Sequence, residues 1–238
     1  MKFKYKTYLR NHVILPGSEK PLHTFLNTLL NRNGKQKKHK LEHAFNPNSE
    51  DALTWSCFDI LRHQPQEKII QALNEIMEDA FEGRIDFSFG NEKNIKIHIG
   101  KNYYASTVAE YTELDASIET DDKLIFVEAK LYSIIGLPDS EKPHDQILRK
   151  LRVGLDVAKH ENKKFYFIFL DIAPKDYTLR FGEKAVNAER FGLYKENSST
   201  LAEMLIENSY KNLEEVSRNM GWLTWASLFK TVLRAVIK

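Results

Sequence analysis

Two runs of alternating polar and apolar residues, at 112–118 and 124–131, stand out along the chain. Because successive side chains of a strand point to opposite faces, each run predicts a strand, and the polar stretch between them predicts a tight turn. One face of the second strand would carry two apolar and then two charged residues: Leu124, Phe126, Glu128 and Lys130. One face of the first would carry Glu113, Asp115 and Ser117, with Leu114, Ala116 and Ile118 behind. If the two strands pair, Asp115 comes close to Glu128 and Lys130.

Apolar residues at helical spacing predict most of the remaining elements. The expected helices cover 21–31, 49–61, 65–81 and 145–160, and the chain is expected to be helical from 199 on, ending in a helix over 228–237. A hairpin is expected from strands 84–89 and 95–99 around Gly90-Asn91. Residues 2–15 fit either an edge strand or a loose arm, and residues 174–198 show no clear pattern.

Residues 164–171 form a nearly continuous apolar run, which is typical of a strand buried on both faces of a central sheet. This strand would follow the helix over 145–160, which in turn would follow the two alternating strands. A helix between strands of one sheet is the order of an α/β protein. We therefore expect an α/β fold with a central mixed sheet.

The three charged side chains of the alternating strands suit one kind of chemistry. Two neighbouring carboxylates, Asp115 and Glu128, repel each other unless a cation lies between them. Mg²⁺ prefers oxygen ligands and often takes one or two carboxylates together with substrate phosphate. The bound ion activates water and stabilises charge on a phosphoryl group, and the ammonium of Lys130 would orient that water or stabilise the same charge. An ordinary hairpin with an exposed salt bridge is the alternative.

Asp115, followed after 13 residues by Glu128-Ala129-Lys130, resembles the active-site hairpin of the PD-(D/E)XK nuclease superfamily. Leu114 stands where the name of the superfamily has proline. The resemblance implies a three-layer α/β/α restriction-endonuclease-like core, with extra helices at both ends of this chain. It also implies a Mg²⁺-dependent nuclease acting on DNA, which we expect to be an endonuclease and in which Mn²⁺ can replace Mg²⁺.

The same resemblance implies roles for individual residues. Asp115 and Glu128 would bind the metal with the carbonyl oxygen of Ala129, and Glu113 would support them. Lys130 would act on the water. Further catalytic or supporting groups would be Glu50, at the start of the helix over 49–61, and Gln146, on the helix over 145–160. Glu50 equally suits a helix N-terminus, and Gln146 equally suits the solvent-facing side of its helix, which we expect to carry Arg149, Lys150 and Arg152 as well.

The composition is that of a protein with a substantial core and no membrane segment. Of the 238 residues 42% are hydrophobic, and the mean hydropathy is −0.47. No apolar run approaches the ~18 residues of a membrane span. The single cysteine, Cys57, excludes an internal disulfide, so we expect a cytoplasmic protein and a buried, unreactive thiol.

Charge is distributed unevenly, although the net charge is only +2. Residues 1–40 contain ten Lys or Arg and one acid, whereas residues 101–145 contain ten acids and four Lys or Arg. A basic region beside an acidic pocket suits a DNA backbone and a metal site, although a solvated basic face would look the same. The stretch 31–40, with five cations and no acid, is expected to be a loop.

We expect a single domain over 1–238, with a basic arm and helix at 1–48, a catalytic core at 49–172 and a helical extension at 199–238. The extension would cover the sheet or form a homodimer. No glycine-rich phosphate loop, zinc spacing or serine-hydrolase motif competes with the carboxylate site. Two other functions remain open: a nuclease-fold module that binds nucleic acid or assembles without catalysis, and a purely structural oligomer.

Overall fold

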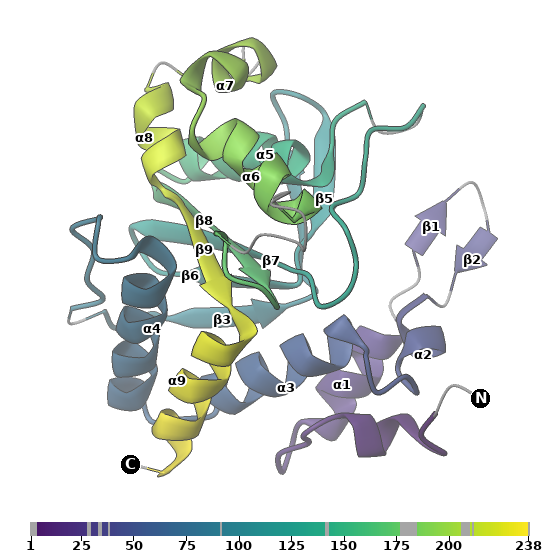
Figure 1. Ribbon diagram of the computed structural model, residues 1–238. Coiled ribbons are helices and arrows are strands. Elements are labelled where there is room, and N and C mark those ends of the chain that lie inside the picture. Colours follow the sequence, from purple (N-terminus) through teal and green to yellow (C-terminus); the bar gives the residue numbers. More distant parts are fainter. Residues whose placement is uncertain are drawn as a thin grey trace.

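A five-stranded mixed sheet lies at the centre of the molecule, seen in a computed structural model (Figure 1). The structure describes residues 4–27, 30–32, 35–37, 39–90, 92–140, 143–176, 185–205, 210 and 212–237. The strands, in their order across the sheet, are β3 (Lys96–Ile99), β6 (Ala116–Glu119), β7 (Lys123–Ala129), β8 (Lys164–Asp171) and β9 (Met220–Thr224). The pairs β3–β6 and β6–β7 are antiparallel, and β7–β8 and β8–β9 are parallel. The prediction of an α/β protein with a central mixed sheet is therefore confirmed.

Helices cover both faces of this sheet (Figure 1). One face packs against α3 (Glu50–Arg62), α4 (Gln66–Phe81) and α9 (Trp225–Ile237). The other packs against α5 (Gln146–His160) and α6 (Val186–Lys195), with the shorter α7 (Ser198–Met204) and α8 (Leu213–Arg218) beside them. The alternation of β7 follows these two layers, because Ile125 and Val127 enter the first cluster and Leu124 and Phe126 the second.

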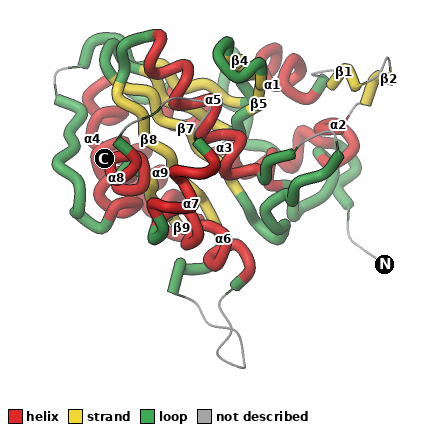
Figure 2. Tube along the Cα trace, turned by 90° about the horizontal axis from the view of Figure 1, so that it is seen from above, coloured by secondary structure: helices red, strands yellow, loops and turns green. Residues whose placement is uncertain are grey.

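The N-terminal part forms a small third cluster against α3. It contains a 3-10 helix η1 (Tyr8–Asn11), then α1 (Glu19–Leu26) and α2 (His39–His43). The short strands β1 (Leu30–Arg32) and β2 (Lys35–Lys37) pair as a hairpin that projects from the molecule beside α1 (Figure 2). The expected loop over 31–40 thus includes a hairpin and the start of α2, and the expected helix over 21–31 begins earlier and ends at Leu26.

The expected hairpin of 84–89 with 95–99 is wrong. Residues 84–89 form no strand, and β3 pairs instead with β6, in the register Ile97 to Ile118. The backbone of Phe89 is occupied elsewhere: its N–H donates to Oδ1 of Asn74 on α4 at 2.7 Å, and its carbonyl accepts from the Asn74 side chain at 3.1 Å. The side chain of Asn74 therefore satisfies the backbone groups of Phe89 that a partner strand would otherwise bond.

The expected strand over 112–118 is divided into two. Its first half is β5 (Glu110–Glu113), which pairs with β4 (Asn102–Ala105) as a separate ribbon, and its second half is β6. Between them the N–H of Leu114 donates to the carbonyl of Lys101, and the carbonyl of Asp115 accepts from the N–H of Gly100. Leu114 consequently packs in the cluster of Phe126 and not behind the sheet with Ala116.

The C-terminal segment was expected to be helical, but it also supplies β9, the edge strand of the central sheet. The helices α3, α5 and the strand β8 lie where the pattern placed them, and Cys57 is buried as expected. No helix in the described ranges is both long and apolar enough to cross a membrane.

Candidate functional site

The site lies where β7 ends. Lys130 follows the last residue of β7, and its N–H still donates to the carbonyl of Leu170 on β8 at 2.7 Å, so the sheet holds the backbone on both sides of Glu128. Glu128 is only 1% exposed and Lys130 only 5%. Charged groups this deeply buried must be paired, because leaving either without a partner would cost several kcal/mol.

Asp115 joins this segment from the break between β5 and β6. Its Oδ2 accepts a hydrogen bond of 2.8 Å from the N–H of Ala129, the residue between Glu128 and Lys130. The break in the alternating strand is what allows this contact, since Asp115 is turned out of the ladder that β6 forms with β7. The structure therefore brings Asp115, Glu128 and Lys130 together, as the sequence led us to expect.

Glu128 lies between two lysines. Nζ of Lys130 lies 2.6 Å from its Oε1, and Nζ of Lys150 on α5 lies 2.6 Å from its Oε2. Lys150 also donates to the carbonyl of Glu113 at 2.6 Å, so it ties α5 to both β7 and the end of β5. We expected Lys150 on the solvent side of its helix, and that expectation is wrong: its side chain is 3% exposed.

The β4–β5 ribbon packs against α5 and helps to bury Lys150, which bonds to the end of β5 as well as to β7. Arg152 was misplaced in the same way, and it is 2% exposed and bonded to Glu110 of β5. One signal in the sequence pointed to this arrangement. Residues 151–158 are apolar on almost every side of the helix, which is typical of a helix buried all round.

Glu50, at the start of α3, contacts the same segment from the face of the sheet that α3 covers. Its Oε2 accepts from the N–H of Leu131 at 2.8 Å and from the hydroxyl of Ser133 at 2.9 Å, and its Oε1 lies 3.6 Å from Nζ of Lys130. Three carboxylates, those of Glu50, Asp115 and Glu128, thus surround the segment that carries Lys130.

Two other residues proposed for the site have different partners. The carboxylate of Glu113 lies 2.6 Å from Nζ of Lys40 on α2, and Lys40 also bonds to Asp51 at 3.0 Å. The side chain of Gln146 accepts from the N–H of Gly136 at 3.1 Å and so holds the loop before α5. Only the backbone carbonyl of Glu113 therefore contacts a residue of the site, Lys150. The side chain of Gln146 bonds to the loop before its own helix.

The electrostatics of the site follow from burial and the two lysines. Burial, together with the negative charge of Glu128, raises the pKa of Asp115 well above its ordinary value. Burial opposes ionisation of Glu128 too, but Lys130 and Lys150 outweigh it and lower the pKa of Glu128 to about 2. Burial likewise opposes the charge on Lys130, yet Glu128, Asp115 and Glu50 raise its pKa. Lys130 is therefore an ammonium group at neutral pH, which can donate hydrogen bonds but cannot accept a proton.

The net charge of the site is negative when all its groups are ionised, which favours the binding of a cation. Glu50, Asp115 and Glu128 with Lys130 and Lys150 carry one net negative charge when all are ionised, and Asp51 and Glu113 with Lys40 carry another. The available donors are carboxylates and the carbonyl of Ala129, which are the oxygen ligands that Mg²⁺ takes. They fit Mg²⁺ in type and charge.

The lysines now occupy several of those oxygens. The carbonyl of Ala129 accepts from Nζ of Lys130 at 3.0 Å, and both oxygens of Glu128 face lysines. Within the described ranges, no three His, Cys, Asp or Glu side chains stand ready to hold a metal ion. Entry of a cation would therefore require the ammonium of Lys130 to leave Glu128.

No family model, curated protein or solved structure matches this chain, so the interpretation of the site rests on its own geometry and chemistry.

Proposed function

We propose that the protein is a Mg²⁺-dependent nuclease of the restriction-endonuclease-like fold that hydrolyses phosphodiester bonds in DNA. The observation that carries the proposal is the hydrogen bond from the N–H of Ala129 to Asp115, which brings one acid onto the segment that supplies the other acid and the lysine. The helices on both faces of the mixed sheet support the same fold.

Asp115, Glu128 and the carbonyl of Ala129 would hold the ion, with Glu50 close to it. The bound Mg²⁺ would supply an activated water and neutralise charge on the phosphoryl group. Once Lys130 has left Glu128, its ammonium is free to donate to the water or to a phosphate oxygen. Lys150 keeps Glu128 ionised and fixed in place. The basic stretch 31–40 would contact the DNA backbone, apart from Lys40, which is already paired with Asp51 and Glu113.

The test is a cleavage panel of supercoiled, linear, single-stranded and branched DNA, with Mg²⁺ or Mn²⁺. Lys130→Met keeps the length of the side chain and removes the ammonium, and we expect it to lower the rate by about 10²–10³-fold, as loss of a charge-stabilising donor does. Asp115→Ala should abolish cleavage. Lys123→Met is the matched control, because Lys123 lies at the other end of the same strand and pairs with Glu92 and Asp122. Equal cleavage by Lys130→Met and the parent would refute the proposal.

A second candidate is a module of the same fold that binds nucleic acid without cleaving it. The observation in its favour is that Lys130 and Lys150 already neutralise Glu128. Calorimetry separates the two candidates, since DNA binding with no uptake of Mg²⁺, in a protein that cleaves no member of the panel, supports the module.

A further inference from the structure

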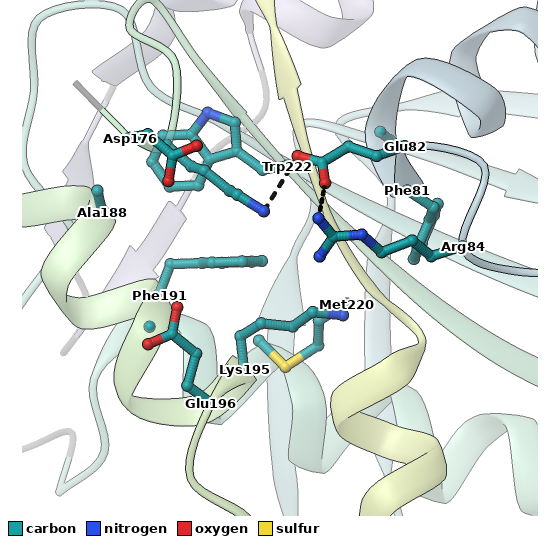
Figure 3. Close-up of a pocket in the computed structure, with 13 residues that line it drawn as sticks. Phe81, Glu82, Arg84, Asp176, Ala188, Phe191, Lys195, Glu196, Met220 and Trp222 are labelled. Carbon is teal, nitrogen blue, oxygen red and sulfur yellow. Dashed lines mark ion pairs between the residues drawn. The ribbon is translucent and has the colours of Figure 1, made fainter.

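A cavity with a polar rim lies beside the edge strand β9 (Figure 3). Its apolar floor comes from Phe81 at the end of α4, Phe191 on α6, and Met220 and Trp222 on β9. Its rim carries six charged residues: Glu82, Arg84, Lys175, Asp176, Lys195 and Glu196. None of these residues belongs to the carboxylate site at the end of β7.

The cations of the rim come from three separate segments and line the same cavity. Arg84 follows α4, Lys175 lies in the loop after β8, and Lys195 is in the last turn of α6. The carboxylate of Glu82 already bridges two of them, with Arg84 at 2.5 Å and Lys175 at 3.0 Å. An oxyanion of this protein thus already lies between two of the three cations.

Lys195 has a different set of contacts. Its Nζ donates to the carbonyls of Ser217 at 2.9 Å and Arg218 at 3.2 Å, at the end of α8. An ammonium has three donors, so one remains for the cavity. Burial and the positive charges of Lys175, Arg84 and Arg218 lower the pKa of Lys195 to about 8, and only Glu82 opposes them. Asp176 and Glu196 also line the cavity.

From this arrangement we infer that the cavity is a binding site for a phosphate group, held by Lys195, Lys175 and Arg84. A planar carboxylate such as that of Glu82 reaches two of these cations. A tetrahedral dianion has enough acceptor oxygens to meet donors from three directions. The group could belong to inorganic phosphate or to a nucleoside monophosphate, whose base would then lie on the apolar floor.

Calorimetry with the full chain at pH 8 tests this inference, with sulfate, inorganic phosphate and adenosine monophosphate as probes. Sulfate matters because its own charge does not change near this pH. Binding should raise the pKa of Lys195, which is half protonated at about pH 8, so sulfate should bind with uptake of up to about half a proton. The uptake is measured as the dependence of the binding heat on the ionisation enthalpy of the buffer. Tighter binding of the nucleotide than of phosphate would identify a nucleotide as the source.

Two variants give opposite expected results. Lys175→Met should weaken binding about tenfold, the usual effect of losing one charged hydrogen bond, whereas Glu82→Gln should strengthen it by removing the competing carboxylate. Lys195→Met should abolish the proton uptake. Because Lys195 also contacts α8, Lys175→Met, whose side chain is 30% exposed, serves as the variant that leaves the fold intact.

Lys20→Met is the control for the change in net charge, since Lys20 is exposed on α1. No binding heat for any probe would overturn the inference, as would equal loss of affinity in Lys20→Met and Lys175→Met. The carboxylate site is not involved in this experiment, so its outcome is independent of the proposed nuclease activity.

Discussion

Nζ of Lys150 on α5 lies 2.6 Å from Oε2 of Glu128 on β7, with the side chains 3% and 1% exposed. This contact joins a helix to the strand that carries the candidate site, and it lies where water cannot replace either partner. Breaking such a pair from one side leaves a buried charge without compensation, which is far more costly than removing both partners.

We therefore predict that Lys150→Met destabilises the protein by about 3–5 kcal/mol, measured by urea unfolding at pH 7. Adding Glu128→Gln should recover part of this loss, because the second change removes the uncompensated charge. Lys159→Met, on the exposed part of the same helix, should change stability by less than about 0.5 kcal/mol. A Lys150→Met protein as stable as the parent would mean that this pair is not formed.

The pairing of Lys150 also shows what the sequence could reveal. The alternation in β7, the apolar run of β8 and the helical spacing in α5 are local patterns, and each predicted its element. They also brought Asp115, Glu128 and Lys130 to one end of the sheet. Whether Lys150 faces solvent depends instead on the β4–β5 ribbon, which comes from a part of the chain some 40 residues away in sequence.

The strand β9 was not predicted, for a similar reason. Met220–Thr224 is short, contains Gly221 and lies between two helical segments, so nothing local distinguishes it from a helix break. Its partner is β8, about 50 residues earlier. The division of 112–118 into β5 and β6 likewise depends on backbone bonds from Leu114 to Lys101 and from Gly100 to Asp115. Contacts between distant segments decided each of these features.

Asp115 should make stability depend on pH. Burial and the charge of Glu128 raise its pKa in the folded chain, so between the unfolded value of about 3.9 and that raised value the unfolded chain ionises first. The stability contributed by the protonated form is present below about pH 4 and is lost as the pH rises through the folded pKa. We predict that Asp115→Asn is more stable than the parent at pH 7 and that the gain vanishes near pH 4.

Thermal unfolding at several pH values measures this gain. Asp86→Asn, on the exposed loop after α4, is the control and should show no comparable difference. Mg²⁺ at millimolar concentration should stabilise the parent and not Asp115→Asn, because an ion that binds the folded state raises its stability. A gain that stays constant from pH 4 to pH 7 would contradict the assigned cause.

Gly154 sets the distance between α5 and the sheet. A Cβ at this position would overlap the ring of Phe165 on β8 and lie 3.0 Å from a ring carbon of Phe126 on β7. Gly154→Ala should therefore destabilise the protein by about 1–3 kcal/mol, although alanine is the better helix former. Gly90→Ala, where nothing lies within 4 Å of the added carbon, should be nearly neutral. Urea unfolding of both variants measures these changes in stability. A Gly154→Ala protein more stable than the parent would show that α5 packs less closely against the sheet.

The reactivity of Cys57 measures how tightly α3 packs against the sheet. The side chain lies in the main hydrophobic cluster at 4% exposure, and burial raises the pKa of its thiol to about 12. Because the thiolate is the reactive form, we predict that the native protein reacts with a disulfide reagent at pH 8 at least about 10³-fold more slowly than an exposed cysteine.

In guanidinium chloride one thiol per chain should react at once, since the sequence contains a single cysteine. Urea below the unfolding midpoint should accelerate the native reaction in proportion to the open population, because the reagent reaches Cys57 only when α3 separates from the sheet. Fast reaction of the native protein in buffer alone would show that this part of the core opens readily. The fixed position of Glu50, at the start of the same helix, would then have to be reconsidered.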